Sequence, residues 1–281
     1  MELKHIAIRD GRLSSFLRGE MKMSAGLVNR LKWQEKIFVN GKPEHNDYAV
    51  MPGDVITAAL DEEEPDYPPQ DGEISILYED EWLLAVDKPA GMLIHPSRSR
   101  FDGTLANYVL GYYVRTGQRS AFHPVTRLDR DTFGIVLLTK NAHIHALVQG
   151  AELKKTYHAL TLGGPKEESG IIDAPIARKE LPSLLREIRP DGKPSITEFR
   201  VLEQNEKLCK LELHPITGRT HQLRVHCAHM GFPILGDPQY GGEKVMGYGW
   251  EHQALCAKSL ELSHPITGQH LMLESRLDVD L

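Results

Sequence analysis

Residues 123–134, HPVTRLDRDTFG, lead directly into the apolar run GIVLLT, and these two segments set the plan of the larger part of the chain. Arginine and aspartate alternate through the first segment, which predicts a loop, whereas the unbroken apolar run predicts a buried strand. A carboxylate on a loop that a buried strand anchors is well placed for chemistry. Asp129 is therefore a candidate catalytic residue. The alternative is that the alternating charges form only a solvated cluster of ion pairs.

Further strand-like runs lie on both sides of this loop. Candidate helices at residues 104–116, 141–151 and 220–230 interrupt them, and the runs themselves are ISILYEDEWLLAVDK, KTYHALTLG, SITEFRVLE and KLCKLELH. Strands and helices do not alternate regularly, as they do in a doubly wound sheet. We therefore expect an α+β domain in which helices flank a mixed, mainly antiparallel sheet.

An acidic segment divides the chain. Residues 61–73, DEEEPDYPPQDGE, hold seven acidic and no basic residues, and without them the net charge changes from −6 to +1. Charge and proline together predict a linker. Before it, residues 1–60 contain two short helix-like and two strand-like segments, which predict a small α+β domain. We expect residues 74–281 to form the second, larger domain.

Composition limits the class of protein. Apolar residues make up 41% and charged residues 26% of the 281, which is typical of a soluble globular chain. No apolar stretch approaches the ~18 residues of a membrane span, and the start MELKHIAIRD has no signal-peptide pattern. The three cysteines are irregularly spaced and predict free thiols. We expect a cytoplasmic monomer with no membrane partner.

The chain contains a series of motifs that resembles one enzyme family. HPVTRLDRDTFGIVLLTKN is similar to the catalytic segment of the RluA-type pseudouridine synthases. The other motifs follow in that family's order over roughly residues 76–242: ILYEDEWLLAVDKPAGMLIHPS, KKTYHAL, GKPSITEFRVLE and LHPITGRTHQLRVHCAHMGFPILGDPQYGG. Phe133 stands where the family commonly has serine, and Cys256 where it often has histidine. The resemblance implies isomerisation of uridine to pseudouridine in structured RNA, without a cofactor.

The resemblance also implies roles for four residues. Asp129 falls on the catalytic aspartate, for which covalent attack and proton abstraction from the ribose are both reasonable. Tyr157 falls on the active-site tyrosine, and Arg127 on an arginine thought to enter the RNA helix as the uridine flips out. Arg224 lies one residue off the apolar stripe of a predicted helix, so a bidentate pair there would keep a sheltered aspartate ionised.

Residues 1–60 resemble the S-four-type RNA-binding module. The matching segments are GRLSSFL, SAGLVNRLKWQEKIFVNGK and MPGDVI. The resemblance implies that Arg30, Lys32, Lys36 and Lys42 line a phosphate-binding face. The same cations also fit a solvated helix face.

Several alternatives remain open at this level. A zinc site is suggested by His221, His226, Cys227 and His229, but the five-residue spacing of the first pair suits one helix face poorly and no CxxC pair completes a set. We therefore expect neither a metal nor a cofactor. A non-catalytic RNA-binding or ribosome-assembly factor and a base-releasing hydrolase are rival functions. The RNA is expected to be ribosomal, from the large subunit, with transfer RNA as the alternative.

Overall fold

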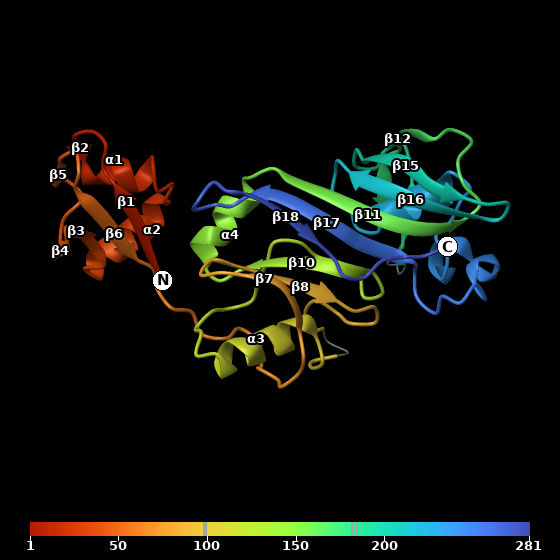
Figure 1. The fold of residues 1–281 in the computed structure, drawn as a ribbon, viewed down its shortest axis with the longest axis horizontal. Coiled ribbons are helices and arrows are strands. Elements are labelled where there is room, and N and C mark those ends of the chain that lie inside the picture. The colour runs from red at the N-terminus through yellow and green to blue at the C-terminus, as the bar shows by residue number, and fades with distance from the viewer. Residues whose placement is uncertain (98–99, 181–182, 184) are drawn as a thin grey trace.

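The computed structural model describes residues 1–97, 100–180, 183 and 185–281. Figure 1 shows a small N-terminal unit beside a larger unit built on a long sheet. The fold is α+β with a mainly antiparallel sheet, as the sequence predicts. No helix among these residues is long and apolar enough to cross a membrane.

The small unit holds the predicted short helices and strands. Its four-stranded sheet has the order β1-β6-β3-β4, and β2 pairs with β5. Helix α2 begins where the Ser24 hydroxyl accepts from Leu27 N at 3.1 Å, and it buries Leu27, Val28 and Leu31. The elements are β1 Glu2–Ile6, β2 Gly11–Arg12, α1 Leu13–Arg18, α2 Ala25–Trp33, β3 Ile37–Val39, β4 Lys42–Pro43, β5 Ala49–Val50 and β6 Val55–Ala59.

The large unit is built on a ten-stranded sheet. The order is β12-β15-β16-β11-β17-β10-β8-β7, with β18 beside β17 and β9 beside β10. Its strands are β7 Ser75–Glu79, β8 Leu83–Lys88, β9 His123–Pro124, β10 Phe133–Thr139, β11 Leu153–Leu162, β12 Ser169–Asp173, β15 Ile196–Gln204, β16 Leu208–Pro215, β17 Leu255–Ser263 and β18 His270–Glu274. A separate hairpin pairs β13 Ile176–Arg178 with β14 Arg186–Ile188.

The helices of the large unit match the three predicted segments within a few residues. They are α3 Leu105–Arg115, α4 Ala142–Gln149 and α5 Gln222–His229, followed by the short α6 Pro238–Gly241 and a 3₁₀ turn, η1 Glu243–Val245. All three cysteines are buried free thiols, as expected.

Strand β10 fixes the position of the Asp129 loop. Every residue of β10 is buried, and it pairs antiparallel with β8 but parallel with β17. At the parallel contact Gly134 has a φ of 103°, and an added Cβ would lie 2.4 Å from the Ala257 carbonyl oxygen. Only glycine fits such a backbone and such a close approach. The loop that carries Asp129 therefore enters the sheet at a fixed point.

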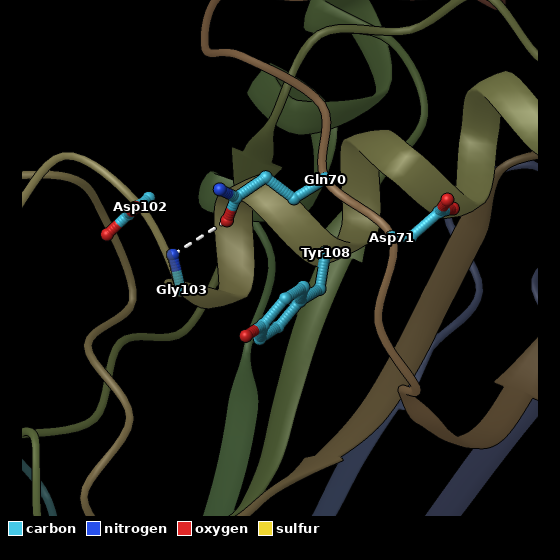
Figure 2. Close-up of a pocket in the computed structure, with 5 residues that line it drawn as sticks. All are labelled: Gln70, Asp71, Asp102, Gly103 and Tyr108. Atoms are coloured by element: carbon cyan, nitrogen blue, oxygen red, sulfur yellow. Dashed lines mark hydrogen bonds between the residues drawn. The ribbon is translucent and has the colours of Figure 1, made fainter.

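The acidic segment makes more contacts than the sequence led us to expect. The Asp66 carboxylate accepts from Phe122 N at 2.9 Å, and Glu63 accepts from Ala142 N at 3.0 Å. Gln70 accepts from Gly103 N at 2.7 Å beside an open hollow that Tyr108 and Asp71 also line (Figure 2). These side chains satisfy backbone N–H groups of the large unit, so the segment is held against it.

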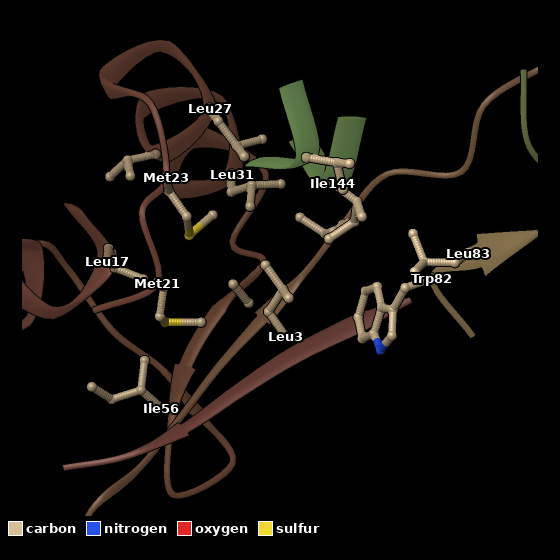
Figure 3. Packing of buried hydrophobic residues seen from close by; sticks show 14 of the residues in the cluster. Leu3, Leu17, Met21, Met23, Leu27, Leu31, Ile56, Trp82, Leu83 and Ile144 are labelled. Carbon is tan, nitrogen blue, oxygen red and sulfur yellow. The ribbon is translucent and has the colours of Figure 1, made fainter. Parts of the chain in front are cut away.

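The small unit also shares its core with the large one. One cluster of buried side chains runs from residues such as Leu3, Met21 and Leu27 to Trp82 and Ile144 of the large unit (Figure 3). Burial of these side chains stabilises the contact by roughly 25 cal/mol for each Å² removed from water. Residues 1–60 are therefore packed against the large unit, and are not merely tethered to it by the predicted linker.

Candidate active site

Asp129 lies in the loop between β9 and β10. Buried neighbours hold this loop: the Thr126 hydroxyl accepts from Leu137 N at 2.9 Å, and Leu128 packs into the core under α3. The Asp129 side chain itself remains 30% exposed. A carboxylate on an anchored loop is thus presented to solvent at a defined position.

Arg224 binds the Asp129 carboxylate directly. Its Nη1 donates to Asp129 Oδ2 at 3.0 Å, and its Nε and Nη2 donate to the two oxygens of Asp237 at 2.7 and 2.8 Å. Nη2 also donates to Gln239 at 2.6 Å, and the guanidinium lies 4.9 Å from the centre of the Tyr240 ring. Burial opposes the charge, but the bonds to Asp237 and the carboxylate of Asp129 raise the pKa of Arg224. Arg224 therefore pairs with Asp129 through a single hydrogen bond, and the bidentate pair that the sequence predicts is formed with Asp237 instead.

The start of α5 places Arg224. The buried Gln222 side chain accepts from Arg219 N at 3.0 Å and from the Thr217 hydroxyl at 2.8 Å, while its amide donates to the Ile196 carbonyl at 2.9 Å. These bonds tie the first turn of α5 to β15. Arg224 follows within the same turn, so its guanidinium is held by a fixed backbone.

Tyr157 stands in the middle of β11, where the pairing with β17 shifts register between Thr156 and Tyr157. Such a bulge re-aims side chains locally. Burial, and then the nearby Asp129 carboxylate, raise the pKa of the Tyr157 phenol above its ordinary value. The hydroxyl is therefore protonated beside the Asp129 carboxylate.

Lys88 holds the loop that carries Asp129 through hydrogen bonds to backbone carbonyls. This fully buried residue donates from Nζ to the carbonyls of Pro89, Met92 and Arg130, each at 2.9 Å. Burial lowers the pKa of Lys88 to about 7, opposed by the carboxylates of Asp131 and Asp129. Three acceptors match the three N–H groups of an ammonium, so we assign the charged form. Because Arg130 follows Asp129 directly, Lys88 fixes the backbone of the loop that carries Asp129.

In the described part of the chain, the other predicted RNA-contact residues take no part in the hydrogen bonds around Asp129. Arg127 is exposed, and no ion-pair or hydrogen-bond partner is found for its side chain among residues 1–97, 100–180, 183 and 185–281. Arg30 and Lys36 both bind Asp61, at 3.0 and 2.6 Å. Lys32 lies 5.6 Å from the ring centre of the exposed Trp33, and Lys42 is exposed on β4. The Arg127 and Lys42 side chains are thus exposed, whereas Lys32 is half-buried.

The histidine and cysteine cluster does not converge on a metal. His226 is fully buried and its ring nitrogens contact the Thr197 hydroxyl at 2.9 Å and the Ala174 carbonyl at 3.0 Å. His221 faces Tyr240 and Asp129 instead. In the described part of the chain, no group of three His, Cys, Asp or Glu side chains has a metal-binding arrangement.

Sequence reasoning missed Lys88, Asp237 and Gln239 as site residues. Lys88 is part of the DKPAG segment and Asp237 of ILGDPQY, both of which belong to the motifs already noted. Lys88 is a charged residue at the end of an apolar run, and this pattern could have marked it as a site residue. Its partner was not visible, because Lys88 reaches a carbonyl 42 residues away in sequence.

The chain is similar to known proteins over most of its length. A family model described as RNA pseudouridylate synthase matches residues 82–229. The chain is 34% identical over 281 residues to the uncharacterized RNA pseudouridine synthase YhcT of Bacillus subtilis (strain 168), covering 97% of this chain and 92% of that protein. It is 32% identical over 264 residues to ribosomal large subunit pseudouridine synthase D of Escherichia coli (strain K12), covering 88% of this chain and 81% of that protein.

A solved structure shows the same fold. Human RNA pseudouridylate synthase domain containing 1 superposes with a TM-score of 0.59 at 24% identity, covering 76% of this chain and 93% of that chain. The matched family segment contains Asp129, Tyr157 and Arg224. RNA pseudouridine synthases are isomerases, and the relatives are named for that reaction. The chain therefore belongs to the RNA pseudouridylate synthase family of isomerases.

Proposed function

We propose that this enzyme converts specific uridines of large-subunit ribosomal RNA into pseudouridine, with Asp129 as the catalytic carboxylate and Tyr157 and Arg224 completing the site. The observation that carries the proposal is the Arg224 guanidinium, which binds Asp129 on one side and the buried Asp237 on the other. Such a clamp holds the Asp129 carboxylate in one orientation. The ribosomal substrate is supported by the relative named for the large ribosomal subunit.

The reaction needs few groups. The bond from N1 of uracil to C1′ of ribose breaks, the base rotates, and C5 bonds to C1′ while a proton leaves C5 and another joins N1. An ionised carboxylate serves either by attacking the sugar or by removing a ribose proton. Tyr157 offers a flat ring near enough to Asp129 for that carboxylate to raise the phenol pKa, which suits stacking on the uracil and assistance at C5. We expect the enzyme to act as a cytoplasmic monomer.

Replacing Tyr157 with phenylalanine separates stacking on the uracil from assistance at C5. The ring remains, so we expect RNA affinity within a few-fold of wild type, whereas loss of the hydroxyl should slow single-turnover formation of pseudouridine by about 10²-fold. Tyr78→Phe is the control, since it removes a tyrosine hydroxyl from the edge strand β7, where Tyr78 donates to the Asp80 carboxylate. Equal rates for Tyr157→Phe and wild type would restrict Tyr157 to packing and stacking.

We propose that residues 1–60 form an S-four-like docking module for the RNA, and that Arg127 enters the helix as the uridine flips out. The half-buried Lys32 and the exposed Lys42 are the first contacts, with Arg30 and Lys36 as further ones. Because Asp61 already binds Arg30 and Lys36, a phosphate must compete with this carboxylate at those two positions.

The double variant Lys32→Ala/Lys42→Ala tests the docking module in the full chain. If each lysine neutralises one phosphate, the slope of log affinity against log salt should fall by about 0.7 to 0.9 for each lysine removed. Single-turnover rates at saturating RNA should not change. The control Lys207→Ala removes an exposed charge between β15 and β16. A slope that falls no further in the double variant than in the control contradicts the docking role.

A further inference from the structure

We infer that His221 is a positioning residue for Asp129: its neutral imidazole presents the Nε2–H to the Oδ2 oxygen of Asp129, which leaves Oδ1 as the reacting oxygen. The inference rests on the proposed catalytic role of Asp129, and it adds a residue and a specific oxygen to that role. Four observations carry it: a backbone conformation, a hydrogen-bond chain, the local charges and the geometry of the carboxylate.

The backbone of His221 is unusual. It has φ 58° and ψ 18°, a left-handed conformation that only three other non-glycine residues share among residues 1–97, 100–180, 183 and 185–281. This conformation is unfavourable for a residue with a Cβ, and such residues gather at functional sites. His221 is also the N-cap residue of α5, yet its side chain makes no capping bond. The ring is turned instead toward Tyr240 and Asp129.

A chain of hydrogen bonds favours one tautomer of His221. The Tyr240 hydroxyl oxygen accepts from Arg186 N at 2.9 Å and lies 2.7 Å from His221 Nδ1. Among the described residues, the proton of this hydroxyl has no other acceptor, so it is donated to Nδ1. A neutral imidazole that accepts at Nδ1 carries its proton on Nε2. That nitrogen lies 3.7 Å from Asp129 Oδ2.

The surrounding charges agree with a neutral ring. Burial lowers the pKa of His221, the carboxylates of Asp129 and Asp237 oppose this, and the guanidinium groups of Arg224 and Arg186 reinforce it. The ring is therefore a neutral group with one N–H directed toward Asp129, and not a second cation. A cation at that place would compete with Arg224 for the carboxylate.

Both partners of Asp129 approach the same oxygen. Arg224 Nη1 lies 3.0 Å and His221 Nε2 3.7 Å from Oδ2. No hydrogen bond to Oδ1 is found within the described ranges, so this oxygen is left for the reaction. Hydrogen bonds of catalytic groups often tighten only when the substrate binds. We expect the His221 contact to shorten to a hydrogen bond in the complex with RNA and to keep Oδ1 aimed at the ribose.

The tautomer is measured directly by ¹⁵N NMR of the histidine-labelled full-length enzyme, with the His221 signals identified by their loss in His221→Gln. We expect an unprotonated Nδ1 and a protonated Nε2 in the wild type, and a mixture of tautomers in Tyr240→Phe. A wild-type ring protonated on Nδ1, or on both nitrogens, would overturn the inference. This result does not depend on the role of Asp129, so it separates the inference from the proposed function.

The effect on chemistry is measured with two substitutions. His221→Asn tolerates the left-handed backbone but is too short to reach Asp129, whereas His221→Gln can still donate to Oδ2. We expect the asparagine variant to lose about 10- to 100-fold in single-turnover rate at saturating RNA, with RNA affinity within a few-fold, and the glutamine variant to recover part of this loss. Loss of affinity alone, or an unchanged rate in His221→Asn, contradicts a positioning role. Thermal unfolding of each variant checks that the fold is intact.

Discussion

Asp129→Asn should lower the single-turnover rate of pseudouridine formation by a factor on the order of 10⁴ or more, the scale seen when a nucleophile is removed. Asparagine keeps the shape of the side chain and its carbonyl still accepts from Arg224, whereas the negative charge is lost. RNA affinity and thermal stability should therefore stay close to wild type. The measurement is pseudouridine formed in a defined large-subunit RNA fragment at saturating enzyme.

A second carboxylate on the same loop provides the matched control. Asp131 lies two residues from Asp129 and pairs with Arg130 at 2.8 Å instead of with Arg224. Asp131→Asn makes the same chemical change, and we expect its rate to remain within a few-fold of wild type. Substantial product from Asp129→Asn, or an equal loss in both variants, would show that Asp129 has no special role. Release of free uracil by the wild type would instead support a hydrolase.

Arg224→Met should cost both stability and activity. Arg224 is 5% exposed and Asp237 only 1%, so removing the guanidinium leaves a buried carboxylate without its charged partner. Breaking a buried ion pair in this way destabilises by about 3 to 5 kcal/mol. Asp129 also loses its anchor, so product formation should fall at RNA concentrations that saturate the wild type. Urea unfolding and single-turnover assays measure the two losses separately.

The double variant Arg224→Met/Asp237→Leu separates folding from catalysis. Two well-packed apolar side chains often replace a buried ion pair without loss of stability. We therefore expect the double variant to regain most of the unfolding free energy but to remain inactive, because the guanidinium that orients Asp129 is gone. Recovery of activity together with stability would mean that the Arg224 clamp serves the fold alone.

The central features of the site follow from local sequence. The apolar run at residues 134–139 predicts the buried strand β10, and the charged segment before it predicts the loop of Asp129. Arg224 is one residue off the apolar stripe of α5, which places its guanidinium at the edge of the core beside a carboxylate. Both predictions rest on periodicity, which is set within one turn of helix or one strand.

Other features depend on contacts between distant segments. The parallel pairing in the sheet joins β10 to β17, whose paired residues Phe133 and Cys256 lie far apart in sequence. The second partner of Arg224, Asp237, comes from the turn after α5. Local patterns carry no information on such pairs. The position of the His221 ring likewise depends on a left-handed backbone conformation, which cannot be predicted from the sequence.

The acidic segment, residues 61–73, makes contacts that its composition does not predict. Seven carboxylates in thirteen residues predict a solvated linker. In the structure Asp61 binds Arg30 and Lys36, Glu63 lies 2.5 Å from His123, and Asp66 accepts from a backbone N–H. Carboxylates are strong acceptors, and partners on both units were available for them. Their charge therefore joins the two units.

A map of carbodiimide-induced reverse-transcription stops in ribosomal RNA tests the central claim most directly. Three cell lines are compared: one with the wild-type chain, one without it, and one carrying Asp129→Asn in its place. We predict that one or a few stops in the large-subunit RNA appear only with the wild-type chain. The same stops in all three lines would contradict the claim that this chain, through Asp129, forms pseudouridine in that RNA.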